Sequence, residues 1–413
     1  MKKVLIIYGY WKREYRYYQL FQTYLEKHGF RVKLMYYNFE CYHEALTWKP
    51  DFVILNQISQ NENIAFAKYL KKCGTRVIVL NAELVFLEED MYFKYAADCN
   101  DYVDYLFESG GDRKFKLLCK YSHLARNKIK MMGTPKLDPY LDVVRKKFPI
   151  TRPYQGKLNP AKKTVCICTS FCFSNGTWNK VKNNIAYQRL GKTRVESTAR
   201  TQRELQRKFI ELTKNIVRTG RCNVIFRCHP LEDSQTYHRA FDSIPEIIFD
   251  NTIHPAELFT AADLIIHRSS TLAVESWIYN IPSVSYDPIP TTIMPLSQFA
   301  RFEKVIHDQS MLLAFVKWFL RGREAPFMVK ERKKYLQDSF GFKKNAQSPA
   351  SKRIAAFMTT IPVSDKRFVL HPYIIYFYTL NMLRILFFKK HIYEVIGMVK
   401  GPQYMKKVIH DST

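Results

Sequence analysis

Short apolar runs alternate with helix-length segments along most of this chain, and this alternation constrains the fold more than any other feature. Val4–Tyr8 and Arg76–Leu80 have the length and composition of buried strands, whereas Tyr15–His28 is amphipathic and ends at Gly29. Apolar strands separated by helices predict a parallel, doubly wound sheet with right-handed crossovers. The predicted strands of the first part are Val4–Tyr8, Arg31–Met35, Asp51–Leu55, Arg76–Leu80, Tyr102–Phe107 and Ile129–Met132, and its predicted helices are Tyr15–His28, Ile64–Cys73 and Leu117–Ala125.

The same alternation starts again at residue 164, after a stretch rich in Pro, Lys and Gly. We therefore expect an α/β fold with two Rossmann-like, doubly wound domains that face a cleft. The predicted parts are a first domain at 1–147, a linker at 148–163, a second domain at 164–350 and a helical tail at 351–413. The predicted strands of the second domain are Thr164–Ser170, Asn223–Cys228, Glu246–Phe249, Leu264–His267 and Ser283–Tyr286, and its predicted helices are Gln202–Thr219, Pro255–Ala262 and Ser270–Tyr279.

The chain is strongly basic, with 65 Lys and Arg against 37 Asp and Glu and a formal net charge of +28. Such a charge favours anionic partners, which include nucleic acid, an anionic membrane surface and phosphorylated or acidic sugars. Nine cysteines form no even framework, so we expect reduced thiols rather than disulfides. Cys166, Cys168 and Cys172 lack the paired spacing of a structural zinc site. The first apolar run is too short for a signal peptide, which favours a cytoplasmic protein.

Polar residues in the second domain follow predicted strands in an order that suits a bound nucleotide. Arg227 and His229 end one strand, where they are able to stabilise charge on a phosphate leaving group. Ser269, Ser270 and Thr271 open a helix, and backbone N–H groups at a helix start bind anions. The further residues predicted to contact the donor are Pro230, Glu232, His267, Arg268 and Glu275, with Ser170 and Asn175 on a loop at the cleft.

Each of these features also has a purely structural interpretation. A Ser-Ser-Thr run before a helix is commonly an N-cap, and His-Pro after a strand is common. Glu275 lies one turn into the predicted helix and suits ribose hydroxyls, yet it also suits a solvated helix face. The ordered combination of all three segments favours the functional interpretation.

These residues resemble a known family. The segments RCHPLED and AADLIIHRSSTLAVESWIYNIPSVSYDP are similar to the C-terminal domains of GT-B enzymes that build surface polysaccharides. The likeness is greatest to bacterial surface carbohydrate (capsule and lipopolysaccharide) biosynthesis proteins, whose relatives include capsule sugar transferases and CDP-glycerol glycerophosphotransferases. Further similar segments are GTPKLD at Gly133–Asp138, CTSFCFSNG at Cys168–Gly176 and NAELVFLEED at Asn81–Asp90.

The resemblance covers most of residues 1–345 and is strongest at 223–288. It implies a nucleotide-binding role for Arg227, His229, Ser270, Thr271 and Glu275. The chain departs from the family pattern at His267-Arg268, where relatives often carry a small residue or Asn. This extra cation suits a strongly anionic donor or reflects the general basic bias.

The acceptor side is predicted to need a base in the first domain. Glu83 follows a predicted strand, with Glu88, Glu89 and Asp90 nearby, so Glu83 and His229 are the predicted catalytic residues. The alternative for Glu83 is an ordinary acid at a helix start. Neither a cofactor nor a metal is required by this scheme, because basic side chains and a helix start are able to neutralise the phosphates.

Two basic segments suggest further partners. Residues 180–221 contain a basic insertion and helix, which either contact an anionic ligand or form a solvated surface. The aromatic and basic tail at 367–407 is interrupted by polar residues, so it suits an interfacial helix or a helix that packs back on the first domain.

We therefore expect a glycosyltransferase that moves a sugar from a nucleotide-sugar donor to a glycan or lipid-linked acceptor at the anionic inner face of the plasma membrane. The alternatives on the same fold are polyol-phosphate transfer and nucleotide-sugar epimerisation. A non-catalytic scaffold and a nucleic-acid-binding protein are rival classes. No nucleic acid is expected as a partner, since no recognition motif accompanies the charge.

Overall fold

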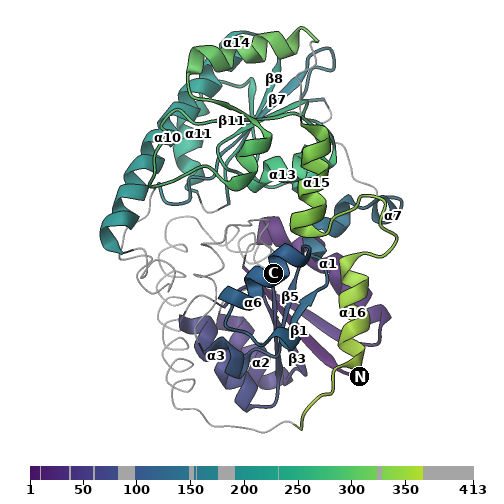
Figure 1. Ribbon diagram of the computed structural model, residues 1–413. Coiled ribbons are helices and arrows are strands. Elements are labelled where there is room, and N and C mark those ends of the chain that lie inside the picture. Colours follow the sequence, from purple (N-terminus) through teal and green to yellow (C-terminus); the bar gives the residue numbers. More distant parts are fainter. Residues whose placement is uncertain are drawn as a thin grey trace, which may run out of the picture.

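The computed structural model describes residues 1–9, 11–36, 39–58, 61–81, 98–147, 153–154, 156–174, 191–230, 232–322 and 328–365. These residues form two six-stranded sheets, one in each domain, and all the strand pairings within them are parallel. Figure 1 shows the two sheets stacked, with α7, α15 and α16 along one side of the junction. The predicted pair of doubly wound α/β domains is confirmed.

The first sheet has the strand order β2-β1-β3-β4-β5-β6. Successive residues of one strand enter different cores because side chains alternate between the two faces of a sheet. In β1, Leu5 and Ile7 pack on one face, and Val4 and Ile6 pack on the other. The strands are β1 Lys3–Tyr8, β2 Arg31–Tyr36, β3 Phe52–Leu55, β4 Arg76–Leu80, β5 Tyr105–Glu108 and β6 Ile129–Met131, and the helices are α1 Trp11–Lys27, α2 Phe39–Trp48, α3 Asn61–Lys72, α5 Cys99–Tyr102 and α6 Asp112–Tyr121.

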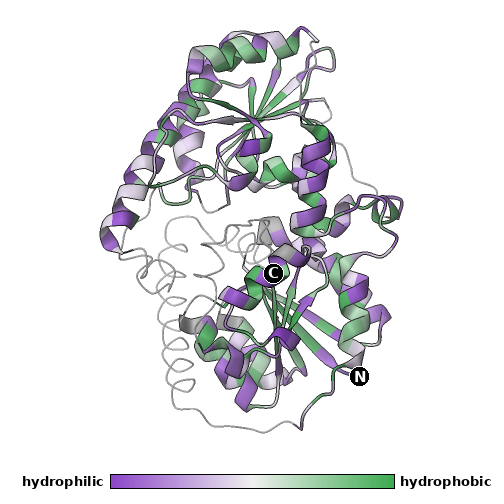
Figure 2. Ribbon diagram, viewed as in Figure 1, coloured by the Kyte–Doolittle hydropathy of each residue, from purple (hydrophilic) through white to green (hydrophobic). Residues whose placement is uncertain are grey.

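The second sheet has the order β12-β11-β10-β7-β8-β9. Its central strand β7 is buried on both faces, which explains the continuous apolar sequence there. Figure 2 shows apolar strands inside and hydrophilic residues on the outer helices. The strands are β7 Thr164–Cys168, β8 Asn223–Arg227, β9 Ile247–Phe249, β10 Leu264–His267, β11 Ser283–Tyr286 and β12 Lys304–Ile306, and the helices are α10 Lys192–Arg218, α11 Ser234–Phe241, α12 Pro255–Leu258, α13 Thr271–Ile278, α14 Gln309–Leu320 and α15 Val329–Phe340.

Several boundaries differ from the predicted ones; α6, for example, covers Asp112–Tyr121 where a helix at Leu117–Ala125 was predicted. Helix α10 begins ten residues before the predicted Gln202, because Val195 and Ala199 extend its buried stripe. The predicted strand 102–107 starts only at Tyr105. Before it, Lys128 Nζ donates to the carbonyls of Asn100 and Val103 at 2.5 and 3.0 Å and holds a helical turn.

Short segments between the domains tie them together. The 3-10 helix η2 (Pro135–Tyr140) precedes α7 (Asp142–Arg145), and its Asp138 is buried. The Asp138 carboxylate accepts the N–H groups of Ala350 and Ser351 at 2.7 and 2.8 Å, at the start of α16 (Ala350–Thr360). Burial raises the pKa of Asp138 to about 6. Helix α16 then packs on the first domain, so the chain returns there after the second.

Several predicted features lie outside the described residues. They are Glu83, Glu88, Glu89, Asp90, Asn175, the basic insertion up to residue 190 and the tail beyond residue 365. Within the described ranges, no helix is long and apolar enough to cross a membrane.

Candidate donor-nucleotide site

The three predicted segments of the second domain meet at one edge of its sheet. Strand β7 lies between β10 and β8, and Cys168 is in register with both His267 and Arg227. Because parallel strands end at the same edge, the loops after these strands are neighbours. The structure therefore places the candidate residues of Arg227–Glu232 beside those of His267–Glu275.

Glu232 clamps two of these loops together from inside the protein. Its Oε1 accepts the backbone N–H groups of Phe171 and His229 at 2.9 and 3.0 Å, and the Thr169 hydroxyl lies 2.9 Å away. The Tyr237 hydroxyl donates to Oε2. Glu232 is 7% exposed, and this burial raises the pKa of its carboxyl group. Protein donors occupy this carboxylate, and a direct contact of Glu232 with the donor stays a prediction.

His229 is held at the mouth of the site by that clamp. The side chain is partly exposed, and its Nδ1 lies 3.0 Å from the Cys172 Sγ. Pro230 follows it and is also partly exposed. The cysteine spacing raised Cys172 only as a possible zinc ligand, and no local pattern reveals this contact between residues 57 positions apart.

Arg227 ends β8 with a buried guanidinium. The residue is 4% exposed, and its Nη1 has no hydrogen-bond partner among the described residues. A buried cation in this condition is costly without a partner, so it indicates a place for an anionic or polar ligand.

The start of α13 supplies the second half of the edge. Ser270 is the N-cap, and its hydroxyl accepts the Leu272 N–H at 3.4 Å. Ser269 has a left-handed backbone with a φ of 53°, and its hydroxyl accepts the Ser297 N–H at 3.0 Å. Thr271 is the first helical residue and is partly exposed. The capping role of Ser270 does not exclude anion binding, because the first turn of a helix presents several N–H groups.

His267 and Arg268 lie buried next to this helix start and make contacts within the protein. His267 is fully buried. Its Nδ1 accepts the Ser270 N–H at 3.2 Å, and its Nε2 lies 2.9 Å from Glu303 Oε2. Arg268 is also buried, and it donates to Asp287 Oδ1 and to the Met294 carbonyl, both at 2.7 Å. These contacts position the helix start, and a contact of either residue with the donor stays a prediction. Their cationic and polar groups are used within the protein.

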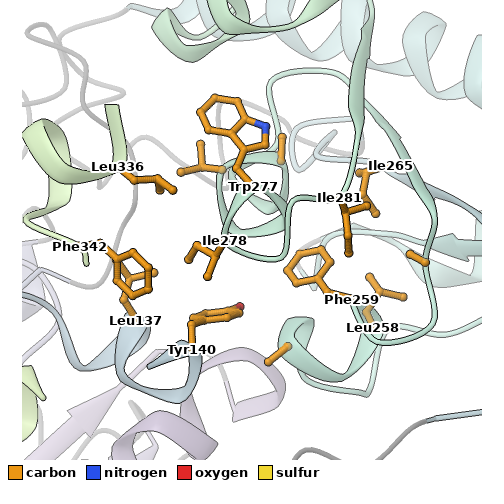
Figure 3. Packing of buried hydrophobic residues seen from close by; sticks show 14 of the residues in the cluster. Leu137, Tyr140, Leu258, Phe259, Ile265, Trp277, Ile278, Ile281, Leu336 and Phe342 are labelled. Carbon is orange, nitrogen blue, oxygen red and sulfur yellow. The ribbon is translucent and has the colours of Figure 1, made fainter. Parts of the chain in front are cut away.

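Glu275 is paired across the domain junction. It is 2% exposed, its Oε1 lies 3.2 Å from Lys136 Nζ, and its Oε2 accepts the Tyr140 hydroxyl. Burial, followed by the charge on Glu275, raises the pKa of Tyr140 well above its usual value, so Tyr140 stays a phenol. Figure 3 shows Tyr140 beside Ile278 and Phe259. A ribose hydroxyl must share or displace one of these partners to reach Glu275, so the ribose contact stays a prediction.

Ser170 completes the inner edge of the site. Its hydroxyl donates to the Arg268 carbonyl at 3.1 Å, which joins the loop after β7 to the loop after β10. Within the part of the chain that is described, no group of three or more His, Cys, Asp and Glu side chains is placed to hold a metal ion.

A cavity of about 500 Å³ lies between the two domains. It is lined by Asp112 at the start of α6, by Arg301 on the 3-10 helix η3 (Gln298–Phe302), and by Lys334 of α15. Ser297, whose N–H donates to Ser269, immediately precedes this lining. None of the described residues predicted to bind the donor lines this cavity, and its walls carry both charges.

Comparison with known proteins agrees on the fold. The chain resembles Methanocaldococcus jannaschii UDP-GlcNAc 2-epimerase in complex with UDP-GlcNAc and UDP, with 16% identity, a TM-score of 0.53, and coverage of 87% of this chain and 99% of that one. It also resembles S. aureus MnaA solved with UDP, with 12% identity, a TM-score of 0.51, and coverage of 89% and 100%. A variant of the wall teichoic acid polymerase TagF soaked with CDPG matches with 14% identity, a TM-score of 0.51, and coverage of 87% of each chain.

No protein-family model and no curated protein sequence matches the chain. At these identities the similar structures establish the fold alone, which is the two-domain α/β arrangement of the GT-B type.

Proposed function

We propose that this protein is a GT-B glycosyltransferase that transfers a sugar from a nucleotide-sugar donor to a glycan or lipid-linked acceptor in surface polysaccharide assembly. The observation that carries the proposal is the convergence of Arg227, His229 and the α13 start on one edge of the second sheet. Basic side chains and backbone N–H donors of this kind bind the phosphates of a nucleoside diphosphate.

The proposed reaction uses these groups to stabilise the departing diphosphate. As the bond to the sugar breaks, negative charge grows on the phosphate oxygens. The Arg227 guanidinium is buried and has an Nη1 without a described partner, so it is available for this charge. Its low-dielectric surroundings strengthen the attraction. His229 and the N-terminal dipole of α13 add to the effect.

The acceptor side of the proposal comes from the sequence and from the space between the domains. Glu83 remains the predicted base and lies outside the described residues. The cavity between the domains offers space for an acceptor. The net charge of +28 and the basic, aromatic tail support attachment to the anionic inner face of the plasma membrane.

Nucleotide-dependent stabilisation tests the donor site. We expect CMP, CDP, UDP, GDP or dTDP to raise the Tm. A nucleotide at a hundred times its Kd raises the free energy of unfolding by about 2.7 kcal/mol, which raises the Tm of a domain of this size by about 5–10 °C. The solved relatives with UDP and CDPG make uridine and cytidine nucleotides the first to try. A complete absence of shifts would refute the donor-site assignment.

Matched variants locate the effect. His229→Ala and Glu275→Gln are expected to abolish the shift, whereas the exposed controls His238→Ala and Glu246→Gln should retain it. Gln is used at position 275 because Ala would leave Lys136 buried beside a void and confuse lost binding with lost stability. Shifts that survive both site variants would move the nucleotide elsewhere.

Product analysis separates the reactions that share this fold. Incubation with labelled nucleotide-sugars and with CDP-glycerol distinguishes transfer of a sugar from transfer of a polyol phosphate. Epimerisation changes the donor without any acceptor. Release of an epimerised nucleotide-sugar, with no transfer to glycan or lipid acceptors, would replace the transferase proposal.

A further inference from the structure

A cysteine and a histidine form a close pair at the sheet edge that carries the candidate site. Cys172 lies in the turn after β7, and its Sγ is 3.0 Å from Nδ1 of His229. Both side chains are partly exposed. An imidazole at this distance is able to take the thiol proton and to stabilise the thiolate as an ion pair.

The pair is held in place by the surrounding structure. Phe171, the residue before Cys172, donates its N–H to Glu232 Oε1, and so does the N–H of His229. One buried carboxylate therefore fixes the backbone on both sides of the contact. Thr169 and Tyr237 hold that carboxylate in turn. A pair supported in this way is pre-organised, since neither loop must move to bring sulfur and imidazole together.

The other thiols have less favourable surroundings. Cys41, Cys99, Cys166, Cys168 and Cys228 are buried. Cys222 is partly exposed, but burial raises its pKa to about 11. Cys73 and Cys119 are also partly exposed, and Cys119, on α6, serves as an internal reference.

We propose that Cys172, activated by His229, is a covalent modification site for small disulfides that carry carboxylates. His229 Nδ1 takes the thiol proton, and the thiolate attacks one sulfur of the disulfide. The disulfide bond breaks as a new S–S bond to Cys172 forms. The departing thiolate takes the proton from the imidazolium, so the products are a mixed disulfide and one free thiol. The basic charge of the protein favours an anionic reagent.

The adduct is positioned to control the proposed reaction. It is attached next to His229 and at the same sheet edge as Arg227. If this edge binds the donor phosphates, as proposed above, the adduct excludes them. This consequence rests on the proposed function, whereas the modification itself does not.

Oxidised glutathione and mass spectrometry test the site on the full-length protein. Occupancy of each cysteine is followed by peptide mapping at about pH 7. We expect Cys172 to react roughly tenfold faster than Cys119, because the imidazole in contact with its sulfur takes the thiol proton. His229→Gln should slow Cys172 roughly tenfold and leave Cys119 and Cys222 unchanged, which also shows that the variant is folded. The rate at Cys172 should depend less on pH between about 6 and 8 than the rate at Cys119.

Two results would overturn the inference. One is a rate at Cys172 no greater than that at Cys119, and the other is a rate that His229→Gln leaves unchanged. Added nucleotide separates this inference from the proposed function. Protection of Cys172 by a nucleotide supports both, whereas fast modification that no nucleotide slows supports the thiol site and counts against the donor site.

Discussion

Replacement of Glu232 by Ala tests whether the loops of the candidate site depend on one buried carboxylate. Four groups donate to it, namely the N–H groups of Phe171 and His229 and the hydroxyls of Thr169 and Tyr237. Each buried donor that loses its acceptor costs about 1–3 kcal/mol. Two effects offset part of this loss. Water enters the vacated space. The variant also no longer buries a carboxyl group whose pKa is raised by burial.

We therefore expect Glu232→Ala to lower the free energy of unfolding by about 3–5 kcal/mol, which is the range for breaking a buried charged network. For a domain of this size that corresponds to a Tm lower by about 6–20 °C. Glu232→Gln should cost less, because its amide oxygen accepts hydrogen bonds and the hydroxyls of Thr169 and Tyr237 are able to rotate toward its NH₂ group.

Urea unfolding of the two variants, with the exposed Glu246→Ala as a control, measures these losses. The reasoning fails if Glu232→Ala costs less than about 1 kcal/mol, since unsatisfied buried donors cannot be that cheap. It also fails if Gln is worse than Ala. A loop that had lost its clamp should in addition lose the fast reaction of Cys172 with oxidised glutathione.

Three further predictions concern the domain junction. Burial raises the pKa of Asp138 to about 6, so its contribution to stability is fully present below its unfolded pKa near 4 and is lost as pH rises through about 6. Asp138→Asn should remove up to about 3 kcal/mol of this pH dependence in urea titrations, and an unchanged pH profile would contradict it. Gly110 has a φ of 129°, and a Cβ there would lie 2.7 Å from the Ser339 carbonyl oxygen, so Gly110→Ala should cost more than about 2 kcal/mol. Gly322 has a φ of 82°, and a Cβ there would meet open space, so Gly322→Ala should cost only about 1 kcal/mol. Equal losses of stability in the two variants would refute the clash at Gly110. Lys136→Met leaves its partner carboxylate buried with one donor fewer and should cost about 3 kcal/mol in unfolding experiments. A loss within experimental error would show that this contact is not maintained in solution.

The sequence alone determined the architecture of this protein. Alternation of short apolar runs with amphipathic helices is a local signal, and it led to two parallel sheets because strands buried on both faces need helices above and below them. It also located the candidate site, since the ends of parallel strands converge without any knowledge of side-chain contacts. Arg227, His229 and Ser270 were found by that argument and by family resemblance.

Only the tertiary structure shows which of these polar residues are engaged by other groups of the protein. Glu232 and His267 occur in the same two motifs as Arg227 and Ser270, but backbone N–H groups and buried side chains contact them. Glu275 pairs with Lys136, from the GTPKLD segment of the other domain, and His229 contacts Cys172. A polar side chain is satisfied by whichever donor or acceptor the fold brings within about 3 Å, and no local pattern encodes that distance.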